Sequence, residues 1–433
     1  MTGLLQAPLT LHPLAASLNE ACQCIWVDRT QLQQQLRAQL GEESALLESR
    51  PGLISGSVVF VGQREAAAMD RTIRLVTRVL ASSACRDRIA RDAPDIARPP
   101  QPASGGVLGF DFHLGGPAPQ LIEINTNPGG LLVSLELARA ATASCDCLAE
   151  PVSMMTSAAV ATSELDSRVT QSFLDEWTSA RGTAPLRTIA IVDDGPQDQY
   201  LYPEFLLYRR LFERAGWRAL IADAAGLVVS GNALHWAGER IDLVYNRVTD
   251  FYFAEPRHAA LRQAYEESLA VITPHPAAHA RWADKRLLAW LGDPGLLAAA
   301  GLDGADREHV LRTIPATELV AAANAADLWR RRKTLFFKPV DGFGGKAAYR
   351  GDKLTRTTFE HVLAHRYVAQ AVAPTSFRRV AAADGQETEL RLDVRNYVWR
   401  GDTWLRAARL YRGQTTNFRT AGGGFAPVLT LPN

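Results

Sequence analysis

The sequence has few cysteines, almost no net charge and no long apolar run, and each shortage excludes a class of protein. Five cysteines in 433 residues are too few for a scaffold built on disulfides. The pairs Cys22/Cys24 and Cys145/Cys147 also lack the usual spacing of zinc ligands. We therefore expect reduced, structural cysteines. The formal net charge of +1 creates no global field that would favour nucleic acid.

The distribution of apolar residues argues against a membrane protein. No stretch approaches the roughly 18 apolar residues that are needed to cross a bilayer. The first residues, Met1 to Gln6, lack the basic start of a signal peptide. Apolar content of 47% and charged content of 21% are typical of a globular chain. We expect a cytoplasmic protein that binds neither nucleic acid nor membrane.

The most informative stretch is the short strand pattern 121–125, which is followed by a Pro-Gly-Gly turn. Glu123 and Asn125 are two residues apart, so both side chains leave the same face of the strand. A carboxylate beside an amide oxygen suits a hard cation such as Mg²⁺, which also takes water and phosphate oxygens as ligands. Taken alone, the motif is equally compatible with an edge strand that ends in an ordinary Asn-Pro turn.

A second motif lies near the C-terminus, where the buried strand pattern 335–337 leads into Lys338 and a glycine-rich loop. Glycines can present backbone N–H groups to phosphate oxygens, and the lysine supplies a point charge on the same oxygens. The loop is neither a Walker A motif nor a dinucleotide-binding glycine motif. The alternative is a glycine hairpin with an incidental lysine. This alternative becomes less convincing because the same chain also contains the Glu123/Asn125 strand.

The order of strand and helix patterns divides the chain into three predicted domains. Residues 1–183 begin with helices and contain the strands around Glu123. Residues 184–275 alternate buried strands with helices, which indicates parallel βαβ packing. Residues 276–433 begin with an alanine-rich helical region and end in strands.

Two further groups of residues follow from this organisation. A hairpin of strands 109–113 and 120–124 would place Asp111 across from Glu123 as a third oxygen donor. In the parallel unit, Asn246 and Arg247 fall at the carboxyl end of a strand, where ligands bind on such sheets.

Together the motifs resemble the ATP-grasp superfamily. The resemblance is carried by Lys338-Pro339 with Gly342, Gly344 and Gly345, by Asp393-Val394-Arg395, by Thr416-Asn417 followed by Gly422-Gly423-Gly424, and by Asp111 with Glu123 and Asn125. The metal strand precedes the lysine loop, an order similar to the circularly permuted arrangement of eukaryotic-type glutathione synthetases. The resemblance implies a permuted ATP-grasp fold of mixed α/β and α+β class, with an inserted parallel βαβ substrate-binding domain. It also requires the 111–125 hairpin to lie beside strands 393–411.

The resemblance implies an ATP-dependent carboxylate–amine ligase that uses ATP and Mg²⁺. A carboxylate becomes an acyl phosphate, and an amine then displaces phosphate to form an amide or peptide bond. The expected substrates are a small-molecule carboxylate and an amine, such as an amino acid or a short peptide, and a homodimer is a candidate assembly. The alternatives are a non-catalytic nucleotide-binding protein and an ATP-dependent phosphotransferase on the same fold.

The resemblance also implies roles for individual residues. The metal ligands would be Asp111, Glu123, Asn125 and Asp341. The nucleotide would contact Lys285, Lys338, Gly342, Gly344, Gly345, Lys346, Gln370 and Asn417. The substrates would contact Arg247, Asn246, Asn127 and Gly423. The catalytic residues would be Lys338, Arg395 and Arg412, which would neutralise the transferring phosphoryl group.

Simpler interpretations remain for three of these residues, and two features depart from the family. Arg247 could form an interdomain salt bridge, Arg395 a charge pair at a strand end, and Lys285 a solvated position on a helix. Asp341 stands one position before the place of the family's loop glutamate. The turn around Asn127 replaces the family's serine-containing turn, so glutathione itself is not assigned as the product.

Overall fold

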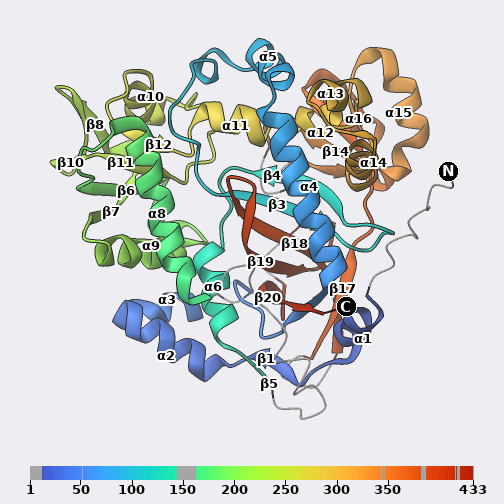
Figure 1. Ribbon diagram of the computed structural model, residues 1–433, viewed down its shortest axis with the longest axis horizontal. Helices are drawn as coiled ribbons and strands as arrows, with labels where there is room; N and C mark the ends of the chain where they lie inside the picture. Colours follow the sequence, from blue (N-terminus) through green and yellow to red (C-terminus); the bar gives the residue numbers. More distant parts are fainter. Residues whose placement is uncertain are drawn as a thin grey trace.

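The computed structural model describes residues 12–50, 52–143, 162–342, 345, 347–381, 387–414, 416 and 420–432. Figure 1 shows a large central sheet with a parallel α/β unit on one side and a smaller antiparallel unit on the other. Within the described ranges, no helix combines the length and the apolarity that a membrane span requires.

The central sheet brings together strands from the two ends of the chain. Its order is β2 (Val59–Gly62), β20 (Gly424–Leu431), β19 (Asp402–Tyr411), β18 (Glu387–Trp399), β3 (Leu108–His113) and β4 (Gln120–Asn125), and β17 (Ser376–Ala381) also pairs with β18. Across β18 and β3, Arg395 pairs with Asp111, and across β18 and β19, Asp393 pairs with Arg409. The predicted position of the 111–125 hairpin beside strands 393–411 is therefore confirmed.

Each face of this sheet is covered by a helix, because apolar side chains alternate along the strands. In Figure 1, α4 (Gln63–Ala81) runs across one face, where Val394 and Ala408 belong to the same buried cluster as Met69 of the helix. On the other face, α6 (Leu131–Arg139) packs against β20. The buried apolar side chains of α4, which include Met69, Ile73 and Val76, therefore face the sheet.

The parallel unit is a sheet in the order β12 (Val271–Thr273), β11 (Leu243–Asn246), β6 (Thr188–Asp193) and β7 (Arg218–Asp223). The helices α8 (Thr162–Arg181), α9 (Tyr202–Arg214) and α10 (Ala259–Glu266) accompany it. All three strand pairs are parallel, as the alternation of strands and helices predicted. Residues that follow β6 and β11 therefore meet at one edge of the sheet.

The smaller antiparallel unit carries the lysine loop. Its order is β13 (Thr317–Leu319), β16 (Tyr367–Ala371), β14 (Leu335–Pro339) and β15 (Tyr349–Arg350). Phe337 of β14 packs into a cluster with Leu328 of α15 (Ala325–Arg331) and Phe359 of α16 (Arg356–Ala364). Because side chains alternate along a strand, burial of Phe337 turns Lys338 to the opposite face.

The remaining elements are shorter or peripheral. They are α1 (Pro13–Ala21), β1 (Ile25–Val27), α2 (Arg29–Leu40), α3 (Ala45–Glu48), α5 (Ser83–Asp92), β5 (Ala141–Ala143), β8 (Leu227–Ser230), β9 (Ala233–Trp236), β10 (Glu239–Ile241), α11 (Pro276–Trp282), α12 (Arg286–Trp290), α13 (Pro294–Ala299) and α14 (Gly304–Thr313). Helices α12 to α14 lie beside the lysine-bearing unit in Figure 1.

A buried arginine attaches the first helix to the central sheet. Arg378 of β17 is only 1% exposed, and its guanidinium donates to the carbonyl oxygens of Val58 at 2.8 Å and Asn19 at 2.9 Å. It also donates to the carbonyl oxygens of Leu18 and Cys22 at the end of α1. The positive charge therefore has main-chain acceptors instead of a carboxylate, and these acceptors come from two other segments of the chain.

The expectation that all cysteines are reduced is wrong for one of them. Cys24 is disulfide-bonded, whereas Cys22 and Cys85 are free and buried. Cys145 and Cys147 lie outside the described residues. Composition could not reveal this bond, because a cysteine count does not show which backbone segments pair.

Candidate active site

A cleft of about 490 Å³ lies where the three sheets meet. Its walls include β4 with Glu123, β14 with Lys338, the end of β11 with Arg247, and the paired strands β18 and β19 with Arg395 and Arg409. Its lining combines apolar side chains with both positive and negative ones. Most of the predicted site residues can therefore be located relative to this one cleft.

Glu123 and Asn125 both line the cleft, as their spacing predicted. The Glu123 side chain is 25% exposed, and its Oε1 lies 3.6 Å from Lys285 Nζ. Asn125 Nδ2 donates to Asp111 Oδ2 at 3.0 Å, which leaves the Asn125 Oδ1 atom for a ligand. The described residues contain no group of three His, Cys, Asp or Glu side chains that could hold a metal by themselves. Two oxygens on one strand nevertheless fit Mg²⁺, which completes its shell with phosphate oxygens and water.

Asp111 lies across from Glu123, as the hairpin predicted, but its carboxylate is held by two arginines. It is fully buried, and its two oxygens accept hydrogen bonds from Arg395 Nε and Nη2, each at 2.7 Å. Arg409 Nη2 adds a third bond at 2.8 Å. Burial raises the pKa of the Asp111 carboxyl, but the charges and hydrogen bonds of the two arginines outweigh it and lower the pKa to about 2. Since its oxygens already have these partners, Asp111 is not placed to bind a metal directly. Its hydrogen bond with Asn125 Nδ2 instead fits the alternative role of orienting a predicted metal ligand.

The arginine network extends to a second buried carboxylate. Arg409 Nε donates to Asp393 Oδ1 at 2.7 Å, and Thr416 Oγ1 donates to Asp393 Oδ2 at 2.8 Å. Arg395 Nη1 reaches the carbonyl oxygen of Gly129 at 3.3 Å. Arg395 therefore forms the charge pair of the simpler interpretation and also lines the cleft. Two arginines and two carboxylates make the middle of the cleft a rigid, nearly neutral centre.

The two lysines predicted to bind phosphates lie close together at another part of the cleft. Lys338 Nζ donates to Gln370 Oε1 at 2.8 Å and to the carbonyl oxygen of Ile122 at 2.9 Å. Burial lowers the pKa of Lys338 to about 8, although the charge of Glu123 opposes this shift. Lys285 is 7% exposed and donates to the carbonyl oxygen of Gly342. The interpretation of Lys285 as a solvated lysine is therefore wrong.

Parts of the glycine loop line the cleft beside these lysines. Gly342 and Gly345 are among its lining residues, and so is Gln370. Gln370 contacts Lys338 and thereby fixes the position of the ammonium group. Three residues predicted to contact the nucleotide, Gly344, Lys346 and Asn417, lie outside the described residues.

Two charged residues predicted for the site point away from the cleft. The Asp341 side chain is 39% exposed and pairs with Arg366 Nη1 at 3.6 Å. A turn in which Gly342 N–H donates to the Pro339 carbonyl oxygen separates it from the cleft. Arg412 is exposed, and its Nη2 donates to Thr388 Oγ1 at 3.0 Å. It follows the last residue of β19, so it leaves the sheet, whereas Arg409 within β19 lines the cleft.

Two predicted substrate-binding residues have structural roles instead. Gly423 lines a separate pocket beside α2, and a Cβ at this position would lie 2.6 Å from the Leu410 carbonyl oxygen. Asn246 Nδ2 donates to the Pro274 carbonyl oxygen at 3.0 Å, and its Oδ1 accepts from Val248 N–H at 3.1 Å. Both groups of the Asn246 amide are therefore used by main-chain atoms of the segments that follow β11 and β12.

Arg247 and Asn127 do line the cleft. Arg247 Nη1 donates to the Tyr245 hydroxyl at 3.0 Å, while its buried Nε has no hydrogen-bond partner. No described carboxylate forms a salt bridge with Arg247, so the structure does not support the interpretation as an interdomain ion pair. Asn127 Oδ1 is also buried without a hydrogen-bond partner. An unpaired donor and an unpaired acceptor are thus available at this end of the cleft.

Two carboxylates near Arg247 were not predicted as functional. Burial raises the pKa of Asp193, at the end of β6, to about 7, although Arg247 opposes the shift. Glu204 of α9 is fully buried and accepts from Gly130 N–H at 2.8 Å and from Leu132 N–H at 3.2 Å. It therefore holds the Pro-Gly-Gly turn and the start of α6. The only sequence signal for Asp193 was its place directly after a buried strand.

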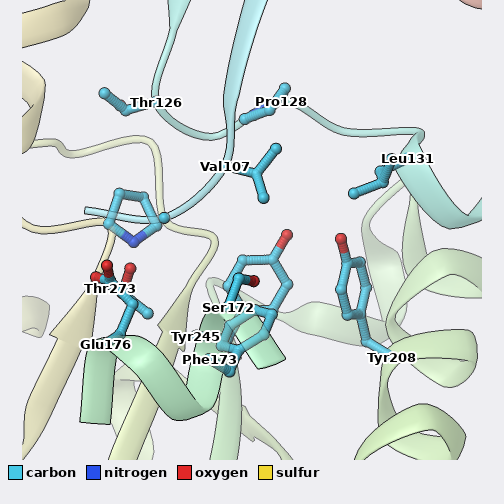
Figure 2. Close-up of a pocket in the computed structure, with 12 residues that line it drawn as sticks. Val107, Thr126, Pro128, Leu131, Ser172, Phe173, Glu176, Tyr208, Tyr245 and Thr273 are labelled. Carbon is cyan, nitrogen blue, oxygen red and sulfur yellow. The ribbon is translucent and has the colours of Figure 1, made fainter. Parts of the chain in front are cut away.

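Behind the turn lies a second, much smaller cavity, shown in Figure 2. Thr126 and Pro128 line one side, and the rings of Tyr208 and Tyr245 line the other, with their hydroxyl groups directed toward the turn. Its volume of about 20 Å³ is enough for roughly one water molecule. The cavity is therefore too small to accept a substrate.

Comparisons with known proteins bear on the fold only. No family model and no curated protein matches the sequence. Among solved structures, a glutathione synthetase-like effector (GSS30) from Globodera pallida matches with a TM-score of 0.51 at 11% identity, over 91% of this chain and 97% of that chain. A candidate gamma-glutamylcysteine synthetase from Methylobacillus flagellatus KT matches with a TM-score of 0.44 at 12% identity, over 82% of this chain and 86% of that chain.

A third match is the ATP-grasp ligase PsnB, whose structure was determined with a minimal precursor, Mg and ADP. Its TM-score is 0.28 at 17% identity, over 55% of this chain and 87% of that chain. The first match extends over nearly the whole of both chains. The chain therefore shares the mixed α/β fold of a glutathione synthetase-like protein.

Proposed function

We propose that this protein is an ATP-dependent ligase that joins a carboxylate to an amine through an acyl phosphate. The observation that carries the proposal is one cleft with three kinds of site along it: Lys338 and Lys285 beside Glu123, the arginine network, and Arg247 with its unpaired Nε. We further propose that the fold is a circularly permuted ATP-grasp fold, in which the parallel unit is an inserted substrate-binding domain.

The lysine end is suited to nucleotide phosphates. Lys285 is buried and Lys338 is half-buried, and their described hydrogen bonds go to neutral oxygens. Glu123 supplies one negative charge beside these two cations, so an anionic ligand such as a phosphate would add the negative charge that balances the second cation. Glu123 and Asn125 would hold Mg²⁺, which when bound neutralises charge on the phosphates. The carboxylate of Glu123 and the two ammonium groups together would orient the transferring phosphoryl group.

The middle of the cleft is suited to the transfer itself. Arg395 and Arg409 are held by Asp111 and Asp393 at 2.7 to 2.8 Å, so they need no reorganisation when charge develops nearby. Arg395 keeps its predicted catalytic role in this proposal, and Arg409 takes the role that the sequence assigned to Arg412.

The far end is suited to the carboxylate substrate. A guanidinium binds a carboxylate through two parallel hydrogen bonds, and Arg247 offers an unpaired Nε there. Asp193 lines the same end, and its carboxyl group provides an acceptor for an ammonium group, whose positive charge would favour the ionised carboxylate. This pairing supports an amino acid or a short peptide as the substrate class.

A substrate screen tests the proposal. The protein would be incubated with ATP, Mg²⁺ and pairs of small carboxylates and amino acids, and the release of ADP and phosphate would be measured. We expect release that requires both substrates, and its loss in Lys338→Met but not in Lys353→Met, which changes an exposed lysine. ADP release without an amine would indicate a phosphotransferase, and nucleotide binding without turnover would indicate a non-catalytic protein. Failure to bind ATP would contradict all three functions.

A further inference from the structure

His258 lies between two carboxylates in the parallel unit. It ends the short helix η6 (Pro256–His258), and its ring is fully buried. Nδ1 lies 2.8 Å from Asp250 Oδ2, and Nε2 lies 2.8 Å from Asp194 Oδ1. An ionised carboxylate only accepts hydrogen bonds, so both ring nitrogens must donate. The ring that satisfies both contacts is therefore the imidazolium cation.

The two carboxylates belong to the two loops that form one end of the cleft. Asp194 follows Asp193, and its carbonyl oxygen accepts from Gln199 Nε2 at 2.6 Å. Both Asp193 and Gln199 line the cleft. On the other loop, Asp250 follows Thr249 and precedes Phe251, which line the cleft together with Arg247. His258 is thus bonded to a neighbour of each lining segment.

We propose that His258 is the positioning residue for this end of the cleft, because its doubly donating ring ties loop 193–199 to loop 247–258 and releases one of them when it loses a proton. The inference rests on the proposed function only for the statement that substrate binds at this end of the cleft. The two hydrogen bonds of His258 that join the loops are present in the chain without any ligand.

The charges around the ring favour its protonated form. Besides Asp194 and Asp250, the nearby charged groups are Arg257, whose Nε lies 3.9 Å from Asp194 Oδ2, and Asp193. Burial lowers the pKa of His258, but the hydrogen bonds and charges of Asp250 and Asp194 outweigh burial and raise the pKa above 6.5. With a raised pKa in the folded state, the tie is present at low pH and is lost as the pH rises through the folded-state value.

Hydrogen exchange on the whole chain without ligand tests this directly. Protection factors of amides in 193–199 and 247–258 would be measured from about pH 6 to about pH 10, with correction for the intrinsic exchange rate. We expect protection of one of the two loops to fall by about tenfold as the ring deprotonates, because one charge-assisted hydrogen bond is lost and the other is kept. His258→Gln, which is neutral throughout, should begin with low protection and show no step.

A matched control is His309→Gln. His309 is also buried, but its Nε2 pairs with Thr72 Oγ1 at 2.9 Å, outside the cleft lining, so this variant should keep the step. A step that persists in His258→Gln, or no step in the unchanged protein, would overturn the proposal.

A spectroscopic measurement keeps the test valid if His258→Gln does not fold. Nitrogen NMR of the unchanged protein should show both ring nitrogens of His258 protonated near neutral pH, and a neutral tautomer would overturn the proposal. Neither measurement involves ATP or turnover, so a failed ligase assay and a failed His258 proposal remain distinguishable.

Discussion

The middle of the cleft and its lysine end differ in the hydrogen-bond partners of their cationic side chains. In the middle, Arg395 and Arg409 share the carboxylates of Asp111 and Asp393 through bonds of 2.7 to 2.8 Å. At the lysine end, Lys338 donates to an amide oxygen and a carbonyl oxygen. The carboxylate nearest to these lysines, Glu123, is 3.6 Å from Lys285.

This difference suggests that the paired arginines stabilise the fold, whereas the lysines are available to bind an anionic ligand. Buried charges that are paired internally cost much stability when one partner is removed. Buried cations with neutral partners instead have lowered pKa values, as Lys338 has, and gain most from an anionic ligand. Substitutions in the middle should therefore affect folding first, and changes at either end should affect binding first.

The largest effect on stability is expected from Asp111→Asn. Arg395 and Arg409 would lose the carboxylate they share, and the free energy of unfolding should fall by about 3–5 kcal/mol. Urea denaturation measures this change. As a control, Asp95→Asn removes an exposed ion pair with Arg98 and should have little effect. Equal stability of the two variants would show that the buried network does not hold the sheet together.

A large effect on turnover, without a comparable loss of stability, is expected from Glu123→Gln. The change keeps the size of the side chain and removes the negative charge that would face Mg²⁺ in the proposed site. Turnover in the reaction found by the screen should fall by about 10²–10³-fold, while urea denaturation stays unchanged. Glu360→Gln, on the exposed side of α16, is the control. Full activity of the Glu123 variant would remove this strand from the metal site.

A smaller effect is expected from Arg247→Lys. Lysine cannot reproduce the two parallel hydrogen bonds of a guanidinium, so the carboxylate substrate should bind more weakly by about 1.5–3 kcal/mol. ATP affinity should stay the same, and Arg262→Lys, an exposed helical residue, should alter neither. Separate titrations of ATP and substrate measure both. Equal weakening of the two ligands would place Arg247 outside the substrate site.

The smallest effect concerns pH. Because the pKa of Lys338 is lowered to about 8, the free protein loses this charge as the pH rises through that value. Nucleotide affinity should then fall above pH 8, by at most about tenfold per pH unit. Lys338→Arg keeps its charge in this range and should bind nucleotide without that decline. The same decline in both proteins would assign it to another group.

The sequence predicted the parts of the site that depend on one strand. The alternation of side chains placed Glu123 and Asn125 on one face, and it turned Lys338 away from the buried Phe337. Both outcomes follow from local geometry, which neighbouring strands do not alter. The parallel unit was predicted for a similar reason, since βαβ order implies the direction of the strands.

The predictions failed where a position depends on register or on a turn. Asp111 was expected at the metal, but the β3–β18 register sets it opposite Arg395. Arg412 was chosen over Arg409 because nothing in the sequence shows that β19 ends at Tyr411. Knowledge of the β18–β19 register would have identified Arg409, which pairs with Asp393. Asp341 was misplaced because the side on which a loop residue emerges is decided by the turn.

The Arg378 contacts give the first helix an unusual importance for a terminal segment. Chain ends generally tolerate trimming, because few contacts depend on them. Here a shortened chain that starts after Cys22 would lose the carbonyl oxygens of Leu18, Asn19 and Cys22 and leave a guanidinium inside the protein with too few acceptors. We therefore expect the shortened chain to be less stable than the whole chain, and urea denaturation would measure the loss.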